Sequence, residues 1–352
     1  MISVDLSFMS VHKALGPGYS FAFFCAEEEY EIKNDHYAIH YQHLQSQEQL
    51  RVFDVIIYWG DFLHWVGYKK WDWLSRFKIR QPELSEEAVF DLWYKLFLLE
   101  GVPELQAKTI IFGGTLYALN AKQLTNKRYL AALTALYRNA RLALLRDQVS
   151  ASFISQLVPT NQDFFGCDCA LLLNKGEAPP PRTAPEKYIL CSFGRSGANV
   201  AITSFATQIA PRMGLKLLGM NWLGHPAGME GLQEKLRLVR EAELVVTDIY
   251  HLAVNSWREG VPALCFGKGN GNPTGTISDK KKEIFYRQMF GSAWYLYLSD
   301  LLEHMRANAE FDTYCRDCLE TITDLPQRDF IISALNKQRD KSFARLLAAI
   351  AN

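Results

Sequence analysis

The 352-residue sequence has no excess of charge of either sign, because 38 lysine and arginine side chains balance 38 aspartate and glutamate side chains. Proteins that bind nucleic acid usually carry a basic excess on the domain that does so. The even balance therefore argues against nucleic acid as a partner.

The sequence also lacks an apolar run that approaches the ~20 residues needed to cross a membrane. Its first twenty residues lack the basic start and the apolar core of a secretory signal. The seven cysteines include only two close pairs, Cys167 with Cys169 and Cys315 with Cys318, and neither has the second matching pair of a zinc site. We expect a cytoplasmic protein with reduced thiols, no metal and no transmembrane segment, and leave peripheral attachment to a membrane open.

One stretch organises the rest of the chain, namely Glu243–Gly267. The apolar run Leu244–Val246 predicts a buried parallel strand. Apolar residues then recur at helical spacing as far as Trp257, and Gly260 is a typical helix end. Pro262–Phe266 predicts the next buried strand, so the stretch is a strand–helix–strand unit.

Asp248 closes the first of these strands, and His251 falls in the first turn of the helix. Ligands of open α/β sheets bind at the carboxyl ends of the strands, and helix amino ends favour anions. The acid and the base are therefore candidate catalytic residues. Two other interpretations stay open: Asp248 as an N-cap, which is common after a strand, and His251 as a surface histidine.

Alternating strands and helices lie on both sides of the proline-rich segment 174–187, which predicts two parallel-sheet domains. Among the predicted strands of the first domain are Val52–Tyr58, Thr109–Phe112 and Leu142–Leu145. We expect an α/β fold of two Rossmann-like domains that face each other across a cleft, as in the GT-B arrangement. The predicted limits are 1–178, 187–328 and a terminal helix, 329–352, that packs back on the first domain.

Three motifs follow one another along the chain, namely Arg146-Asp147-x-x-Ser150, Asp168-Cys169-Ala170, and Val245–His251 with Gly260-Val261-Pro262. Within about residues 50–300, they resemble the motifs of the polysaccharide pyruvyl transferases, in that family's order. The first resembles the family's Arg-Asp-x-x-Ser, the second stands in the place of its Asp-Pro-Ala, and the third resembles its Asp-Arg-x-His followed by Gly-x-Pro. Ile249 stands where the family has the arginine of the third motif.

The resemblance implies a GT-B-like fold and a phosphoenolpyruvate donor, with no further cofactor. The implied reaction moves the pyruvyl group onto two hydroxyls of a sugar as a cyclic ketal, in the synthesis of a cell-surface or exopolysaccharide. The implied partners are thus phosphoenolpyruvate and a saccharide acceptor.

Such a donor carries a phosphate and a carboxylate, so its site needs cations or backbone donors. His251 is the candidate proton donor to the methylene carbon, because histidine exchanges a proton most readily near neutral pH. Arg146 could instead form a structural ion pair with Asp147, and the other candidate cations could simply contact solvent. The candidate donor-binding cations are Arg195, Arg146, Lys280, Lys281 and Lys282.

Two rival functions fit the same sequence. One is a GT-B glycosyltransferase that uses a nucleotide sugar, with the glycine-rich loop Gly267–Gly275 near the diphosphate. The other is a non-catalytic member that binds a glycan, which the isoleucine at position 249 favours. Supplying each donor in turn separates the three.

Overall fold

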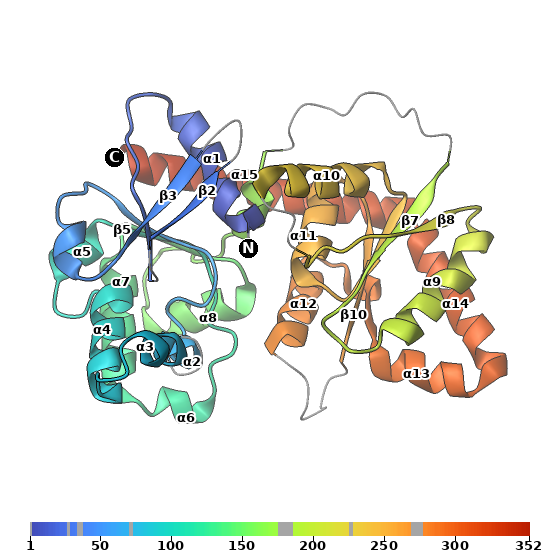
Figure 1. Cartoon of the computed structure of the whole chain (residues 1–352), viewed down its shortest axis with the longest axis horizontal. Helices are drawn as coiled ribbons and strands as arrows, with labels where there is room; N and C mark the ends of the chain where they lie inside the picture. Colours follow the sequence, from blue (N-terminus) through green and yellow to red (C-terminus); the bar gives the residue numbers. More distant parts are fainter. Residues whose placement is uncertain are drawn as a thin grey trace. The chain divides into compact units, whose positions relative to one another are not determined.

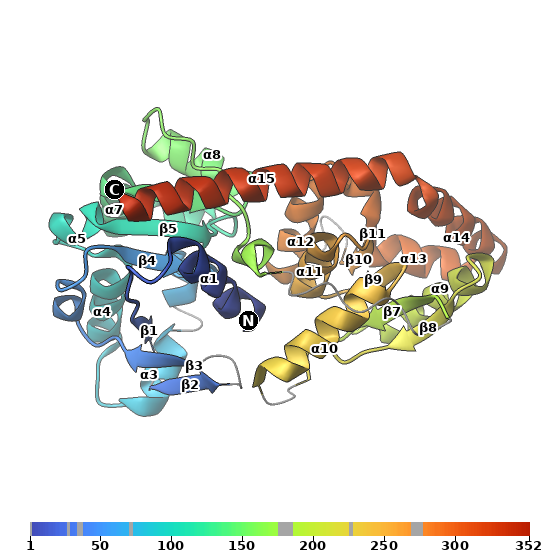
Figure 2. The same ribbon diagram turned by 90° about the horizontal axis from the view of Figure 1, so that it is seen from above.

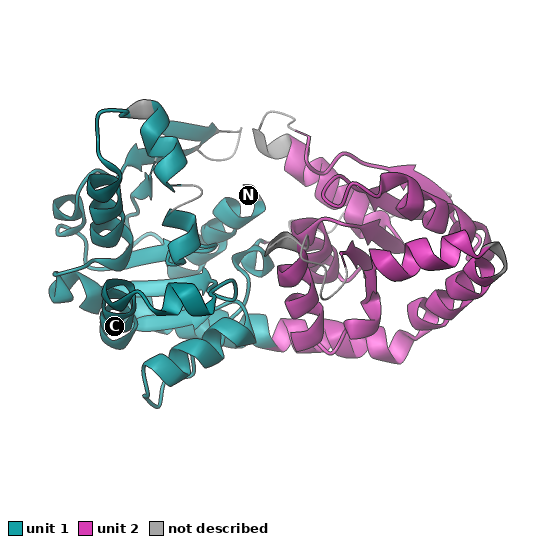
Figure 3. Ribbon diagram, turned by 90° about the horizontal axis from the view of Figure 1, so that it is seen from below, with its two compact units in different colours: residues 1, 3–173, 338–352 teal, residues 2, 174–337 magenta. Residues whose placement is uncertain are grey.

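The computed structural model forms two compact units (Figure 1, and from above in Figure 2), which Figure 3 colours separately. Unit 1 holds residues 3–173 and 338–352, and unit 2 holds residues 174–337. The sequence predicts the boundary between the two domains at 178–187. The proline run that indicates this boundary lies outside the described residues. The structure describes residues 2–26, 29–33, 38–69, 73–174, 186–224, 228–268 and 277–352.

Unit 1 contains two three-stranded sheets. One is parallel, with the order β4-β5-β6, and its central strand is buried along its whole length. The other has the order β1-β3-β2, with β1 parallel and β2 antiparallel to β3. The strands are β1 (Phe23–Cys25), β2 (Tyr30–Lys33), β3 (Ala38–His43), β4 (Ile56–Trp59), β5 (Thr109–Gly114) and β6 (Leu142–Leu145).

Side-chain caps begin several helices of unit 1. The hydroxyl of Ser85 accepts from the Ala88 amide at the start of α4, and Asn126 and Asp147 cap α7 and α8 in the same way. The helices are α1 (Ile2–Leu15), η1 (Gln47–Leu50), α2 (Val66–Tyr68), α3 (Leu74–Arg80), α4 (Glu86–Leu98), α5 (Pro103–Ala107), α6 (Ala121–Leu124), α7 (Lys127–Asn139), α8 (Gln148–Leu157) and η3 (Cys169–Leu172).

Unit 2 is built on one five-stranded parallel sheet with the order β11-β10-β9-β7-β8. Helices α10, α11 and α12 contact one another in turn on one face, and α9, α13 and α14 contact one another on the opposite face (Figure 1). The elements are β7 (Tyr188–Ser192), α9 (Asn199–Arg212), β8 (Lys216–Gly219), α10 (Gly228–Glu241), β9 (Leu244–Thr247), α11 (Tyr250–Glu259), β10 (Ala263–Gly267), α12 (Ile277–Gln288), η4 (Ser292–Trp294), β11 (Tyr295–Tyr297), α13 (Leu298–Arg306) and α14 (Asn308–Thr323).

This strand order contains a topological switch point between β7 and β9. The chain leaves β7 toward β8 at one edge of the sheet, and then returns to the other side of β7 to form β9, β10 and β11. The connections that follow β7 and β9 therefore diverge from neighbouring strand ends. In doubly wound sheets, ligands bind outside the carboxyl ends of the strands at such a point.

The predicted α/β class with parallel sheets is confirmed, and so is the strand–helix–strand unit in the middle of the chain. Gly260 ends α11 with a φ of 84°, which is the left-handed conformation that glycine adopts without strain. The strand predicted from Val52 is wrong in its first half, because Val52 is 81% exposed and β4 begins at Ile56. Among the described helices, none has the length and apolar character needed to span a bilayer.

A 27-residue helix, α15 (Leu325–Ala351), contributes to both units (Figure 2). The part of α15 from Gln338 onward belongs to unit 1, where the side-chain amide of Gln338 donates to the Gly166 carbonyl at 2.9 Å. Asp163 pairs with Lys341 at 2.8 Å, and its carbonyl accepts from Arg345 at 2.7 Å. These bonds fix the last part of the helix on the segment that follows α8.

Gly113 and Gly101 offer a matched pair for testing packing in unit 1. Both have a positive φ, of 72° and 82°, so alanine strains the backbone at either position by about 1–2 kcal/mol. A Cβ on Gly113 also lies 2.4 Å from the Cys169 sulfur, whereas a Cβ on Gly101 meets nothing within 4 Å. We expect Gly113→Ala to lose a further ~1–3 kcal/mol of unfolding free energy through this overlap. Urea unfolding of both variants measures the difference, and equal losses would contradict it.

Candidate functional site

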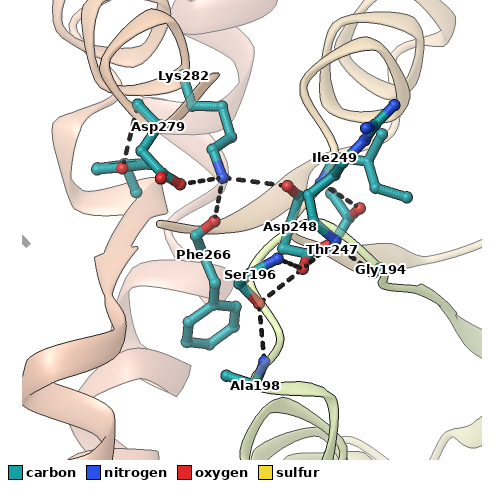
Figure 4. A network of polar contacts seen from close by, with 11 residues as sticks. Gly194, Ser196, Ala198, Thr247, Asp248, Ile249, Phe266, Asp279 and Lys282 are labelled. Atoms are coloured by element: carbon teal, nitrogen blue, oxygen red, sulfur yellow. Dashed lines mark hydrogen bonds and ion pairs between the residues drawn. The ribbon is translucent and has the colours of Figure 1, made fainter. Parts of the chain in front are cut away.

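Asp248 lies at the switch point and holds the connection that follows β7 (Figure 4). Its carboxylate accepts from the backbone amides of Gly194, Arg195 and Ser196 at 3.0, 2.9 and 2.7 Å, and from the Ser196 hydroxyl at 2.7 Å. The N-cap of α11 is Ile249, which makes no side-chain cap bond, so the N-cap interpretation of Asp248 is wrong.

Successive backbone amides in a turn form a concavity that attracts an anion. In this protein the carboxylate of Asp248 occupies that concavity, and the side chain is fully buried. Four donors on its two oxygens leave the carboxylate engaged with the chain itself. Its geometry is that of a group that positions the turn, rather than one that exchanges a proton with a ligand.

Lys282, a predicted donor-binding lysine, is fully buried and points into unit 2 (Figure 4). Its ammonium donates to the carbonyls of Asp248 at 3.1 Å and Phe266 at 2.8 Å, and pairs with the Asp279 carboxylate at 2.9 Å. The three N–H donors of a lysine thus have three acceptors. The structure therefore gives Lys282 contacts with the backbone behind the switch point and corrects its assignment as a ligand-facing cation.

His251 stands in the first turn of α11 and is half-buried. Its ring packs edge-on against Tyr250 with centroids 5.0 Å apart. Its backbone carbonyl accepts from the side-chain amide of Asn255 at 2.6 Å. Lys281 places its ammonium 4.7 Å from the centroid of the Tyr250 ring. Lys281, rather than Lys282 or the exposed Lys280, is thus the lysine that reaches the immediate neighbour of His251.

The two helices that leave the switch point both begin without a side-chain cap. Ala198 is the N-cap of α9 and Ile249 that of α11, and neither supplies a side-chain acceptor. The exposed Arg195 lies in the turn just before α9. Helix amino ends carry a partial positive charge, so the carboxyl ends of β7 and β9 lie near two helix dipoles and a cation. That arrangement suits an anionic ligand.

Ile249 is 4% exposed, so the position at which the resembled family has arginine is a core position here. Its backbone amide donates to the Thr247 hydroxyl at 3.0 Å, and that hydroxyl donates to the Ser192 carbonyl at 2.7 Å. A side chain directed into the core does not contact a ligand. Ile249 therefore supplies neither charge nor hydrogen bond from its side chain at the carboxyl end of β9.

Arg146, in unit 1, is buried and pairs with two carboxylates. Its guanidinium lies 3.5 Å from Asp168, which is equally buried, and 3.8 Å from the more exposed Asp61. The Phe62 ring lies 5.3 Å from the guanidinium carbon. Two motifs that the sequence separates thus meet in one ion pair, and the charge of Arg146 is balanced within the chain.

Asp147 does not form the ion pair with Arg146 that the sequence suggested. It caps α8 by accepting from the Ser150 amide at 2.8 Å, and also accepts from the hydroxyls of Ser150 and Thr115. The Ser150 hydroxyl in turn accepts from the Leu116 amide at 2.7 Å. This network ties the start of α8 to the connection after β5, so these motif residues have structural partners.

Sequence reasoning missed the roles of Ser196 and Lys282. Lys282 shares a helix face with Phe285, Tyr286 and Met289, which are all buried, and this spacing is a signal of an inward side chain. Ser196 offers no such signal, because its partner lies 52 residues away. Most of the glycine-rich loop Gly267–Gly275 lies outside the described residues.

Six of the seven predicted site residues belong to unit 2, and Arg146 belongs to unit 1. Within the ranges that the structure describes, no three histidine, cysteine, aspartate or glutamate side chains are grouped to hold a metal ion. No family model matches the chain, and no curated protein matches it.

Proposed function

We propose that the protein is a transferase that moves the pyruvyl group of phosphoenolpyruvate onto a saccharide as a ketal, in the synthesis of a cell-surface or exopolysaccharide. The observation that carries the proposal is made at the carboxyl ends of β7 and β9 in unit 2. Two helices without a side-chain cap, α9 and α11, begin there, and the exposed Arg195 precedes the first of them. A donor with a phosphate and a carboxylate is the kind of anion that helix starts and an arginine bind. Lys281 supplies a further positive charge beside His251.

In the proposed reaction, His251 donates a proton to the methylene carbon, which becomes a methyl group. A sugar hydroxyl attacks the adjacent carbon and returns its own proton to the imidazole. A second hydroxyl then displaces inorganic phosphate and closes the ketal, and its proton leaves with the phosphate. Asp248 acts as a positioning residue, because its carboxylate is occupied by the turn that bears Arg195.

The resemblance extends this proposal to the arrangement of the two units, which we propose to be GT-B-like, and to a cytoplasmic location. The seven cysteines are free thiols, in keeping with a reducing compartment. Neither extension is needed for the donor site, which lies within unit 2.

The test is to incubate the purified protein with phosphoenolpyruvate and a panel of glycans. We expect release of inorganic phosphate together with a gain in mass of one glycan, and neither product without the acceptor. Transfer from a nucleotide sugar instead would identify a glycosyltransferase. Glycan binding without transfer from any donor would identify a non-catalytic binding protein.

A further inference from the structure

Strands β7, β9 and β10 of unit 2 are neighbours in the parallel sheet, so their carboxyl ends lie side by side. The turn Gly194–Ser196 follows the first, Asp248 the second, and Phe266 lies at the end of the third. Strand pairing fixes the strands themselves, but the connections beyond them need other bonds to keep one arrangement. Figure 4 shows that the polar contacts of two side chains, Asp248 and Lys282, supply such bonds.

The two side chains act in series. Lys282 donates to the backbone carbonyl of Asp248 and to that of Phe266, which ties the start of the connection after β9 to the end of β10. The carboxylate of Asp248 then accepts from the turn after β7. Asp279, one helical turn before Lys282, neutralises the ammonium at 2.9 Å. Contacts between side chain and backbone thus run without a break from α12 to the turn after β7.

We propose that Lys282 is a positioning residue whose ammonium ties the end of β10 to the connections after β9 and β7, and so sets the geometry of a donor site that it does not touch. The effect on the donor rests on the proposed function. The linkage between Lys282 and the turn Gly194–Ser196 does not, because it follows from contacts within unit 2 alone.

The physical reason is that bulk solvent does not reach the buried ammonium to replace its partners. Lys282 is fully buried and each of its three donors has an acceptor in the chain. A methionine at this position fills similar space but donates nothing. The backbone carbonyl of Asp248 then loses its hydrogen bond from Lys282, and the Asp248 carboxylate no longer has a fixed position under the turn. The amides of Gly194–Ser196 consequently open to solvent more often.

Amide hydrogen exchange measures this opening directly. In Lys282→Met we expect the amides of Gly194, Arg195 and Ser196 to exchange roughly 10–100 times faster, the scale on which one buried charge-assisted bond is lost. The amide of Ile202, inside α9, should exchange at its original rate and serves as the internal reference. Lys280→Met, an exposed change on the same helix, should leave all of these rates unchanged.

Two further variants keep the test decisive. Asp248→Asn weakens the same bonds directly and should reproduce the faster exchange of the turn. If Lys282→Met does not fold because Asp279 is left buried without a cation, the double variant Lys282→Met/Asp279→Leu removes both charges. Unchanged exchange at Gly194–Ser196 in a folded variant without the Lys282 ammonium would overturn the proposal.

Calorimetric titration with phosphoenolpyruvate tests the consequence for the donor. We expect Lys282→Met to bind it about 10–100-fold more weakly, as when a residue that orients a site is removed, and Lys282→Arg to recover part of the loss. Faster exchange with an unchanged affinity would refute the effect on the donor. If the wild-type protein does not bind phosphoenolpyruvate, the proposed function fails, and the exchange rates still decide whether Lys282 holds the turn.

Discussion

We expect His251→Ala to transfer the pyruvyl group about 10²–10⁴-fold more slowly than the wild-type protein, the usual scale for loss of a general acid. The proton for the methylene carbon has no other donor in the proposed reaction. The fold should persist, because the His251 ring is only half-buried and packs at the edge of Tyr250. Phosphate release in the presence of the acceptor, followed over time, measures the rate.

His251→Gln should be nearly as slow, because glutamine forms hydrogen bonds but does not deliver a proton. His304 provides the matched control, since it is another half-buried histidine of unit 2 whose ring packs on a tyrosine. His304→Ala should therefore keep the wild-type rate. Rates within a few-fold of wild type in both His251 variants would show that this histidine is only a residue at the start of a helix.

The second large effect concerns stability in acid, where a buried histidine and a half-buried aspartate of unit 1 act in opposite directions. Burial lowers the pKa of His64 to about 3, and its Nε2 has no hydrogen-bond partner among the described residues. In the unfolded chain a histidine titrates near ~6.5, so only the unfolded state binds the proton in between. The stability due to His64 is thus present above pH ~6.5 and is lost as the pH falls toward 3.

Asp5, on α1, has the opposite effect. Burial raises its pKa to about 6, although the Tyr41 hydroxyl bonds to it. The folded state therefore holds a proton that the unfolded state releases near pH ~3.9. The stability due to Asp5 is fully present below pH ~4 and is lost as the pH rises through 6.

Single substitutions separate the two contributions. Between pH 6 and 4, we expect Asp5→Asn to lose about 2–3 kcal/mol of unfolding free energy because His64 then acts alone, and His64→Gln to gain a similar amount. The difference between the two variants should thus change by about 5 kcal/mol over this range, since all other groups are common to both. Urea unfolding at each pH measures the free energies. Parallel pH profiles would contradict the prediction.

The sequence predicted the central part of unit 2 well, because its signals there are local. An apolar run marks β9, helical spacing marks α11, and Gly260 marks the end of that helix. No such signal marks α1, where apolar and polar residues do not separate onto distinct faces of the helix. Cys169–Leu172 carries no decisive signal either, because so short an apolar run does not distinguish a strand from the turn of 3₁₀ helix found there.

The candidate site was predicted in part, for a related reason. Asp248 and His251 were found because they stand at a strand end and a helix start, positions that a sequence pattern locates. The partners of Asp248 were not found, since the turn that it binds lies more than fifty residues away. Arg146 was assigned to a ligand because its partner Asp168 comes from another motif, and no local pattern joins the two.

The division of α15 between the two units has a consequence for how the chain folds. Unit 1 needs residues that follow the whole of unit 2 in the sequence, and its bond between Arg141 and the Ala349 carbonyl spans 208 residues. Contacts so distant in sequence form slowly, because a long loop must close first. Unit 2 is continuous, so during synthesis it has all of its residues before unit 1 does. We therefore expect the unit that begins first to be completed last.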